Sequence, residues 1–400
     1  MEKSNSLVKL WDQPINGRQI YFVAFLCYFL PTFLSETTFS MTIDNHWLRI
    51  LSYVSLPLLL FKIYVLDHWR KKELFIISIA MIIGLIVWRK ASYPDLLVLA
   101  PFMIGAKNVN FRDIVRWYFY LTVILMGTLV AFSLIRIIPN LIYHSELRPT
   151  RCSLGMLYPS VIAAHYLYLV LAYSYLKFGR LHISDYLLFI LGDYVCMRLT
   201  DTKLDFIATL IVIPIIIITQ RAFFRKPLSS KIASFWWMAT PISATVMIFL
   251  SYFYTSSNHL LRKANSLLSD RLSLGHEAFE KYRVNLFGRT IVEHSFAGAE
   301  GHKFASSGLQ NHYFYIDSSY IRMILLWGLV AFLIVICCLT FIAIRSTIHK
   351  TYIVSAVLLI ASLSFMFEPH IIQIIYNPFI LALFSNSYYS KLNKEIKNAK

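Results

Sequence analysis

The sequence predicts an all-α integral membrane protein that crosses the bilayer many times. Hydrophobic residues make up 58% of the 400-residue chain and charged residues only 15%, whereas a soluble domain carries about 25% charged residues. The apolar residues come in long blocks, and a helix needs about 20 of them to cross a bilayer. These two observations exclude a soluble multidomain protein, and we expect a single membrane domain over residues 1–400.

Twelve apolar segments are candidates for transmembrane helices. The fourth contains Pro94 and Pro101, the seventh contains Asp193 and the twelfth contains Asn377-Pro378, so these three are short or interrupted. The predicted segments, in order, are residues 20–37, 48–66, 74–88, 93–106, 114–135, 155–178, 185–198, 204–220, 235–254, 319–344, 351–367 and 370–387.

The net charge of +17 is explained by membrane topology. Lys and Arg concentrate in the connections on one side of the predicted helices, for example residues 70–72 and 221–231. Because cytoplasmic loops are enriched in Lys and Arg, both termini are predicted to be cytoplasmic. Residues 1–19 are polar, and no cleavage site follows them, so we expect a retained first helix rather than a signal peptide. The expected partner is the lipid bilayer, and nucleic-acid binding is not needed to explain the charge.

One long polar segment, residues 255–318, connects the ninth and tenth predicted helices on the outer side. Loops longer than about 12–15 residues are usually functional or disordered, and the hydrophobic periodicity here predicts partial helix. Its histidines are widely spaced, so no metal site is expected. No phosphate-binding loop occurs in the chain, so we expect no nucleotide and no other cofactor. Five cysteines form neither a disulfide framework nor a CxxC pair.

Basic residues on the outer side are the first candidates for chemistry. Arg148 and Arg151 precede the sixth helix, Lys203 precedes the eighth, and Arg271 lies in segment 255–318. Guanidinium groups bind phosphate bidentately, so these residues indicate an anionic ligand. The alternative is contact with lipid headgroups or simple solvation.

Acidic residues at membrane depth are the second signal. Asp193, Asp317 and Glu368 lie in or beside apolar runs, where an ionisable group is a functional candidate. Asp193 could instead form an ion pair with Arg198, and Asp317 could cap a helix. His312, five residues before Asp317, is a candidate general base.

Three short motifs resemble bacterial polysaccharide polymerases of the Wzy type. Residues 151–159 (RCSLGMLYP) are similar to the Arg-x-x-x-Gly-(hydrophobic)-x-(His/Tyr)-Pro-Asn signature, although Ser160 stands where the family often has Asn. Residues 271–279 with 285–288 are similar to the outer-loop motif of the family. The third motif is Asp-Ser-Ser-Tyr at 317–320, followed by Trp-Gly at 327–328. Glu368 and Asn377 are similar to the closing pattern.

The resemblance implies a metal-independent membrane glycosyltransferase with a GT-C-like fold. Such an enzyme polymerises lipid-linked oligosaccharide repeat units into capsular polysaccharide, exopolysaccharide or O-antigen at the outer face of the bacterial cytoplasmic membrane. Its donor is a polyprenyl-pyrophosphate-linked glycan, and flippase and chain-length-regulator proteins are candidate partners.

The resemblance also suggests roles for single residues. A base removes a proton from the acceptor hydroxyl, arginines bind pyrophosphate, and tyrosines line the sugar site. The predicted base is His312, Asp317 or Glu368; the predicted substrate-binding residues are Arg151, Arg271, Arg148, Lys203, Tyr158 and Tyr320. Lys203 replaces the arginine that the family often has and cannot bind phosphate bidentately. A ligase of the same superfamily, a lipid-linked oligosaccharide flippase or other transporter, and a non-catalytic scaffold remain alternatives.

Overall fold

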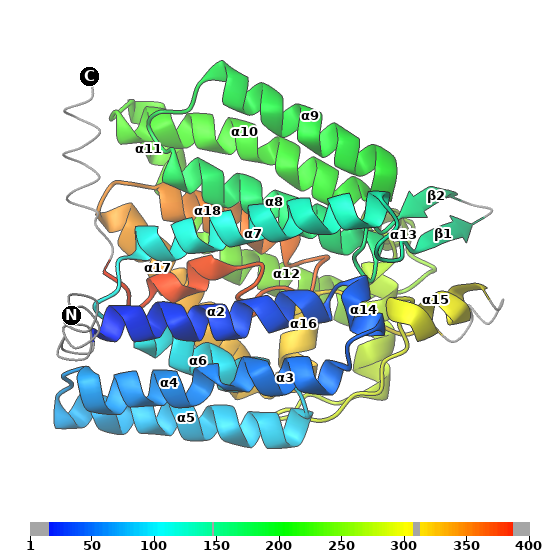
Figure 1. Cartoon of the computed structure of the whole chain (residues 1–400). Helices are drawn as coiled ribbons and strands as arrows, with labels where there is room; N and C mark the ends of the chain where they lie inside the picture. Colours follow the sequence, from blue (N-terminus) through cyan, green and yellow to red (C-terminus); the bar gives the residue numbers. More distant parts are fainter. Residues whose placement is uncertain (1–15, 146–147, 307–312, 387–400) are drawn as a thin grey trace, which may run out of the picture.

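The computed structural model describes residues 16–145, 148–306 and 313–386. The long helices run side by side, and the hairpin of β1 (Ile142–Ser145) and β2 (Arg148–Cys152) lies at one end of them (Figure 1). The same end carries α14 (Arg271–Lys281) and α15 (Gly298–Ser306). We call it the loop end, because both helices belong to segment 255–318.

The other helices follow the order of the chain. Those before the hairpin are α2 (Gly17–Ser35), α3 (Asn45–Tyr53), α4 (Ser55–Phe61), α5 (Lys71–Ala91), α6 (Asp95–Gly105) and α7 (Phe111–Leu134). Those after it are α8 (Pro159–Leu176), α9 (Ile183–Thr200), α10 (Lys203–Phe223), α11 (Pro227–Ala233), α12 (Ala239–Tyr252), α13 (His259–Leu267), α16 (Ser319–Arg322), α17 (Gly328–Ile348) and α18 (Ile353–Ser364). Short 3-10 or π-helical pieces are Thr38–Met41, Lys62–Leu66, Trp236–Met238, Met323–Trp327 and Pro378–Ala382.

The prediction of twelve membrane-spanning helices is wrong. Among the described residues, eight helical segments are long and apolar enough to cross a membrane. They are Gly17–Ser35, Asn45–Leu66, Lys71–Ala91, Phe111–Leu134, Pro159–Leu176, Lys203–Phe223, Pro227–Tyr252 and Ser319–Ile348. The chain therefore has the features of a multi-pass membrane protein, and the cytoplasmic location of its termini stays a prediction.

The remaining four predicted spans fail for two physical reasons. Helices α6 and α18 are too short, and segment 370–387, as far as it is described, forms turns and the 3-10 helix Pro378–Ala382. The residues of these pieces are mostly buried against protein. Hydropathy counts apolar residues whether they face lipid or protein, so interior pieces resemble spans. Helix α9 differs, because it carries Asp185, Asp193 and Arg198.

The prediction that segment 255–318 is partly helical is confirmed. Helices α13, α14 and α15 all lie within it. Asn265 holds the first two together, because its side-chain oxygen accepts a hydrogen bond of 2.9 Å from the backbone nitrogen of Ser273. Helix α14 packs against α12, which precedes the segment. The segment is thus anchored to the bundle and not a free loop.

Candidate active site

Arg151 lies near the end of β2, where the hairpin meets two helices. Its Nε atom donates a hydrogen bond of 2.7 Å to the backbone oxygen of Thr200, the last residue of α9. Its Nη1 atom donates to the hydroxyl of Tyr158 at 3.1 Å, and its guanidinium carbon lies 5.1 Å from the centre of the Tyr158 ring. These contacts fix the direction of the guanidinium group at the loop end.

The turn after Arg151 depends on Gly155. This glycine has φ +90°, which favours a residue without a side chain, and a Cβ there would lie 3.0 Å from side-chain atoms around the end of α7. Its backbone oxygen accepts a hydrogen bond of 2.8 Å from Thr38, and the nitrogen of Leu157 donates to the backbone oxygen of Glu36 at 3.0 Å. The first motif is therefore fastened to the end of α2.

Arg271 begins α14, and a glycine one turn later sets how closely this helix packs. A Cβ on Gly275 would lie 2.4 Å from Cδ1 of Ile321 and 2.8 Å from Oγ of Ser251. Only a residue without a side chain lets α14 lie so close to α12 and α16. This packing brings Nη2 of Arg271 to 3.2 Å from Oδ2 of Asp317.

The guanidinium group of Arg271 is not fully satisfied by protein. Its Nη1 atom donates a hydrogen bond of 2.7 Å to the backbone oxygen of Ser269. Its Nε atom is buried and has no hydrogen-bond partner within the described part of the chain. A buried donor without a partner costs about 1–3 kcal/mol, so an anionic ligand at this position would remove a penalty.

A buried ion pair holds the chain that leads into Asp317. Oε1 of Glu293 lies 2.7 Å from Nη1 of Arg322 and also accepts a hydrogen bond of 3.0 Å from the nitrogen of Ile316. Both charged side chains are less than one tenth exposed. Burial raises the pKa of Asp317, and the nearby Arg271 and Arg322 oppose that rise. The pair therefore fixes the backbone next to Asp317.

Glu368 follows α18 and is 5% exposed. Its Oε2 atom lies 3.3 Å from Nε2 of His370. The pKa of Glu368 is raised, mainly by burial and to a smaller extent by the Asp317 carboxyl. Arg271 and Arg151 act to lower it but do not outweigh these two causes. Both arginines and Asp317 thus act on one buried carboxyl. We call Arg151, Tyr158, Arg271, Asp317 and Glu368 the arginine–carboxylate cluster.

Sequence reasoning missed three neighbours of this cluster. Asp205 on α10 is 3% exposed, and Glu368, Arg271 and Arg151 are all near enough to influence it electrostatically. Its position two residues after Lys203 was the available signal. Glu293 and Arg322 gave none, because a pair separated by 29 residues is recognisable only after folding.

The other predicted residues are not assigned to this cluster. Tyr320 is fully buried and its hydroxyl donates to the backbone oxygen of Ser362 at 2.9 Å, so we reassign it from sugar contact to packing of α16 on α18. Lys203 is exposed at the start of α10. Arg148 opens β2, and His312 lies outside the described residues.

The described residues contain no group of three or more His, Cys, Asp and Glu side chains that could hold a metal ion. No known family model matches the chain, and neither does any curated protein or solved structure.

Proposed function

We propose that the protein is a membrane glycosyltransferase that polymerises lipid-linked oligosaccharide repeat units into capsular polysaccharide, exopolysaccharide or O-antigen at the outer face of the bacterial cytoplasmic membrane. One observation carries the proposal. Arg271 lies 3.2 Å from Asp317 and keeps a buried Nε donor without a partner in the described residues, and Arg151, far from it in sequence, is near enough to act electrostatically on the same buried carboxyl, Glu368. The motifs that resemble Wzy-type polymerases contain both arginines.

The two arginines suit a pyrophosphate group. A guanidinium presents several donors in a fixed plane and stays charged, so it binds phosphate oxygens strongly. Arg151 and Arg271 stabilise the negative charge that develops on the departing lipid pyrophosphate. The ion pair with Asp317 orients Arg271 while the donor site is empty.

Glu368 is the best placed general base of the cluster. Burial raises the pKa of both carboxyls, and a carboxylate with a raised pKa is a better proton acceptor. Asp317 is engaged by an ion pair with Arg271, whereas the side chain of Glu368 lies against His370. The acceptor sugar hydroxyl attacks the anomeric carbon of the donor and gives its proton to Glu368. The bond between that carbon and the pyrophosphate oxygen breaks, and lipid pyrophosphate leaves with the electron pair. The anomeric configuration is inverted.

The test is a deletion in the native host, complemented with variants, followed by sizing of extracted lipid-linked glycans by mass spectrometry. The deletion, R271A and E368Q should each accumulate single repeat units on an externally accessible lipid. The matched control is R283A, because Arg283 is an exposed arginine of the same segment; it should restore long polymer at equal protein level.

Three outcomes would contradict the proposal. Long polymer made by R271A or E368Q would remove the cluster from catalysis. Full-length polymer stranded on its lipid in the deletion would indicate a ligase, which uses the same kind of donor. Single units retained on the inner face would indicate a flippase.

A further inference from the structure

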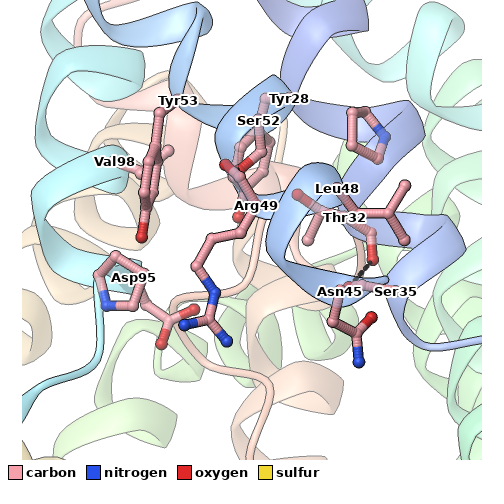
Figure 2. A pocket seen from close by; sticks show the side chains of 12 residues that line it. Tyr28, Thr32, Ser35, Asn45, Leu48, Arg49, Ser52, Tyr53, Asp95 and Val98 are labelled. Atoms are coloured by element: carbon pink, nitrogen blue, oxygen red, sulfur yellow. Dashed lines mark hydrogen bonds between the residues drawn. The ribbon is translucent and has the colours of Figure 1, made fainter. Parts of the chain in front are cut away.

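A separate cavity of about 300 Å³ lies at the loop end, between α2, α3 and the start of α6 (Figure 2). Its walls carry polar groups from all three helices, among them Ser35, Asn45, Arg49 and Asp95. None of the residues that line it belongs to the arginine–carboxylate cluster. Ligand pockets span about 300–1,000 Å³, so this one has room for a small ligand or one sugar unit of a larger one.

The cavity exists because α6 starts below the end of the bundle. A Cβ on Gly84 of α5 would lie 3.5 Å from the backbone oxygen of Leu96, so the first turn of α6 is level with Gly84. Helix α5 continues for seven further residues to Ala91, which is about 10 Å at 1.5 Å per residue. Asp95 at the start of α6 therefore lies roughly 10 Å short of the end of α5 along the bundle.

The lining suits a neutral, hydroxyl-rich ligand. Arg49 and Asp95 are the charged residues of the lining, one cation and one anion, so their formal charges sum to zero (Figure 2). The rings of Tyr28 and Tyr53 give it apolar surface. A carboxylate accepts hydrogen bonds from hydroxyl groups, a guanidinium and an amide donate to them, and aromatic rings pack against the C–H faces of a sugar. A phosphate or other anion would meet Asp95.

A chain of contacts joins the cavity to the arginine–carboxylate cluster. Ser35 on the cavity wall is followed by Glu36, whose carboxylate accepts a hydrogen bond from the hydroxyl of Tyr376. The ring of Tyr376 stacks on His370 with centroids 3.6 Å apart. His370 in turn lies 3.3 Å from Glu368. Glu36, Tyr376 and His370 thus link the wall of the cavity to Glu368.

We propose that this cavity binds a glycosyl unit of the acceptor glycan, and so sets which sugar hydroxyl reaches Glu368. The inference rests on the proposed function, in which the acceptor hydroxyl attacks a donor held by Arg151 and Arg271. Asp95 and Arg49 bind the hydroxyl groups of the acceptor and discriminate between sugars, because a polar site rejects analogues that leave its groups unpaired. They are positioning residues and take no part in bond breaking.

The test uses the full-length protein in lipid nanodiscs. The probe is the repeat-unit oligosaccharide released by mild acid from the lipid of the deletion strain, and its binding is measured by titration calorimetry. D95N keeps the shape of the side chain, and R49M keeps the methylene chain of an exposed residue, so both should fold. We expect each to weaken binding by about tenfold or more, as loss of a charged hydrogen bond does. R271A is the contrasting variant: it should bind the oligosaccharide normally and make no polymer.

Wild-type binding by both D95N and R49M would overturn the acceptor-site proposal, whatever R271A does. Loss of binding in R271A to the same degree would place the acceptor at the cluster and would also overturn it. The proposed function fails separately if deletion of the gene leaves the glycan profile unchanged while D95N still weakens oligosaccharide binding.

Discussion

The close packing of α14 can be tested by adding one methyl group at Gly275. Carbon atoms normally lie about 3.5–4.0 Å apart, but a Cβ here would be 2.4 Å from Cδ1 of Ile321. The overlap is therefore about 1.1–1.6 Å, and either Ile321 or the whole of α14 must move. Overpacking of a closely packed interior costs about 1–3 kcal/mol, against which alanine gains about 1 kcal/mol of helix propensity.

Gly127 provides the matched control. It also lies within a helix, α7, but a Cβ there would meet nothing within 4 Å. G127A gains the same helix propensity without overlap, so the difference between the two variants isolates the packing cost of about 1–3 kcal/mol. The thermal midpoint of purified G275A should therefore fall below that of G127A. Polymer output should also fall, because movement of α14 lengthens the 3.2 Å contact between Arg271 and Asp317.

Equal thermal midpoints for G275A and G127A would refute the packing argument. A lower midpoint with normal polymer output per folded molecule would keep the packing and refute the claim that the position of α14 matters for activity.

Three further predictions follow from buried polar groups. R322M should destabilise the protein by about 3–5 kcal/mol, since it leaves the Glu293 carboxylate buried without its partner, and E293Q in the same chain should recover part of the loss in thermal midpoint. Burial raises the pKa of Glu36 to about 7; the Asp95 carboxyl adds to this rise, and His370 and Tyr376 oppose it. The unfolded chain releases the proton at lower pH, so the stability of the folded protein falls as the pH rises from about 4.5 to 7. E36Q should therefore flatten this part of the curve of thermal midpoint against pH. Y320F should lower the thermal midpoint, because it leaves the backbone oxygen of Ser362 without its hydrogen bond at a cost of about 1–3 kcal/mol. Polymer output per folded molecule should stay unchanged. Loss of output without loss of stability would return Tyr320 to the sugar site.

Much of the candidate site was predictable because its residues are chemically unusual for their surroundings. Arginines on the predicted outer side and acids beside apolar runs stand out in a chain with 15% charged residues. Arg151, Arg271, Asp317 and Glu368 were all selected in this way, and the structure brings them together. Tyr320 was not distinguishable, because a tyrosine in an apolar helix serves packing as readily as binding.

The cavity between α2, α3 and α6 could not have been found from the sequence. Its residues are ordinary members of three helices, and no spacing relates Tyr28 to Asp95. The cavity depends on the height at which α6 begins, which is set by packing against Gly84. That is a relation between two helices and not a property of either.

The sequence by itself determined that the protein is helical and apolar enough for a membrane, and which charged residues were candidates for the site. Composition and hydropathy depend only on which residues are present along each segment, so they can be evaluated without a structure. Only the tertiary structure decided how many segments can span the bilayer, because α6, α18 and segment 370–386 are apolar for contact with protein and not with lipid. It also decided which charges meet. The ion pair of Arg271 with Asp317 depends on how closely α14 approaches the chain at the start of α16, and here a glycine sets that distance.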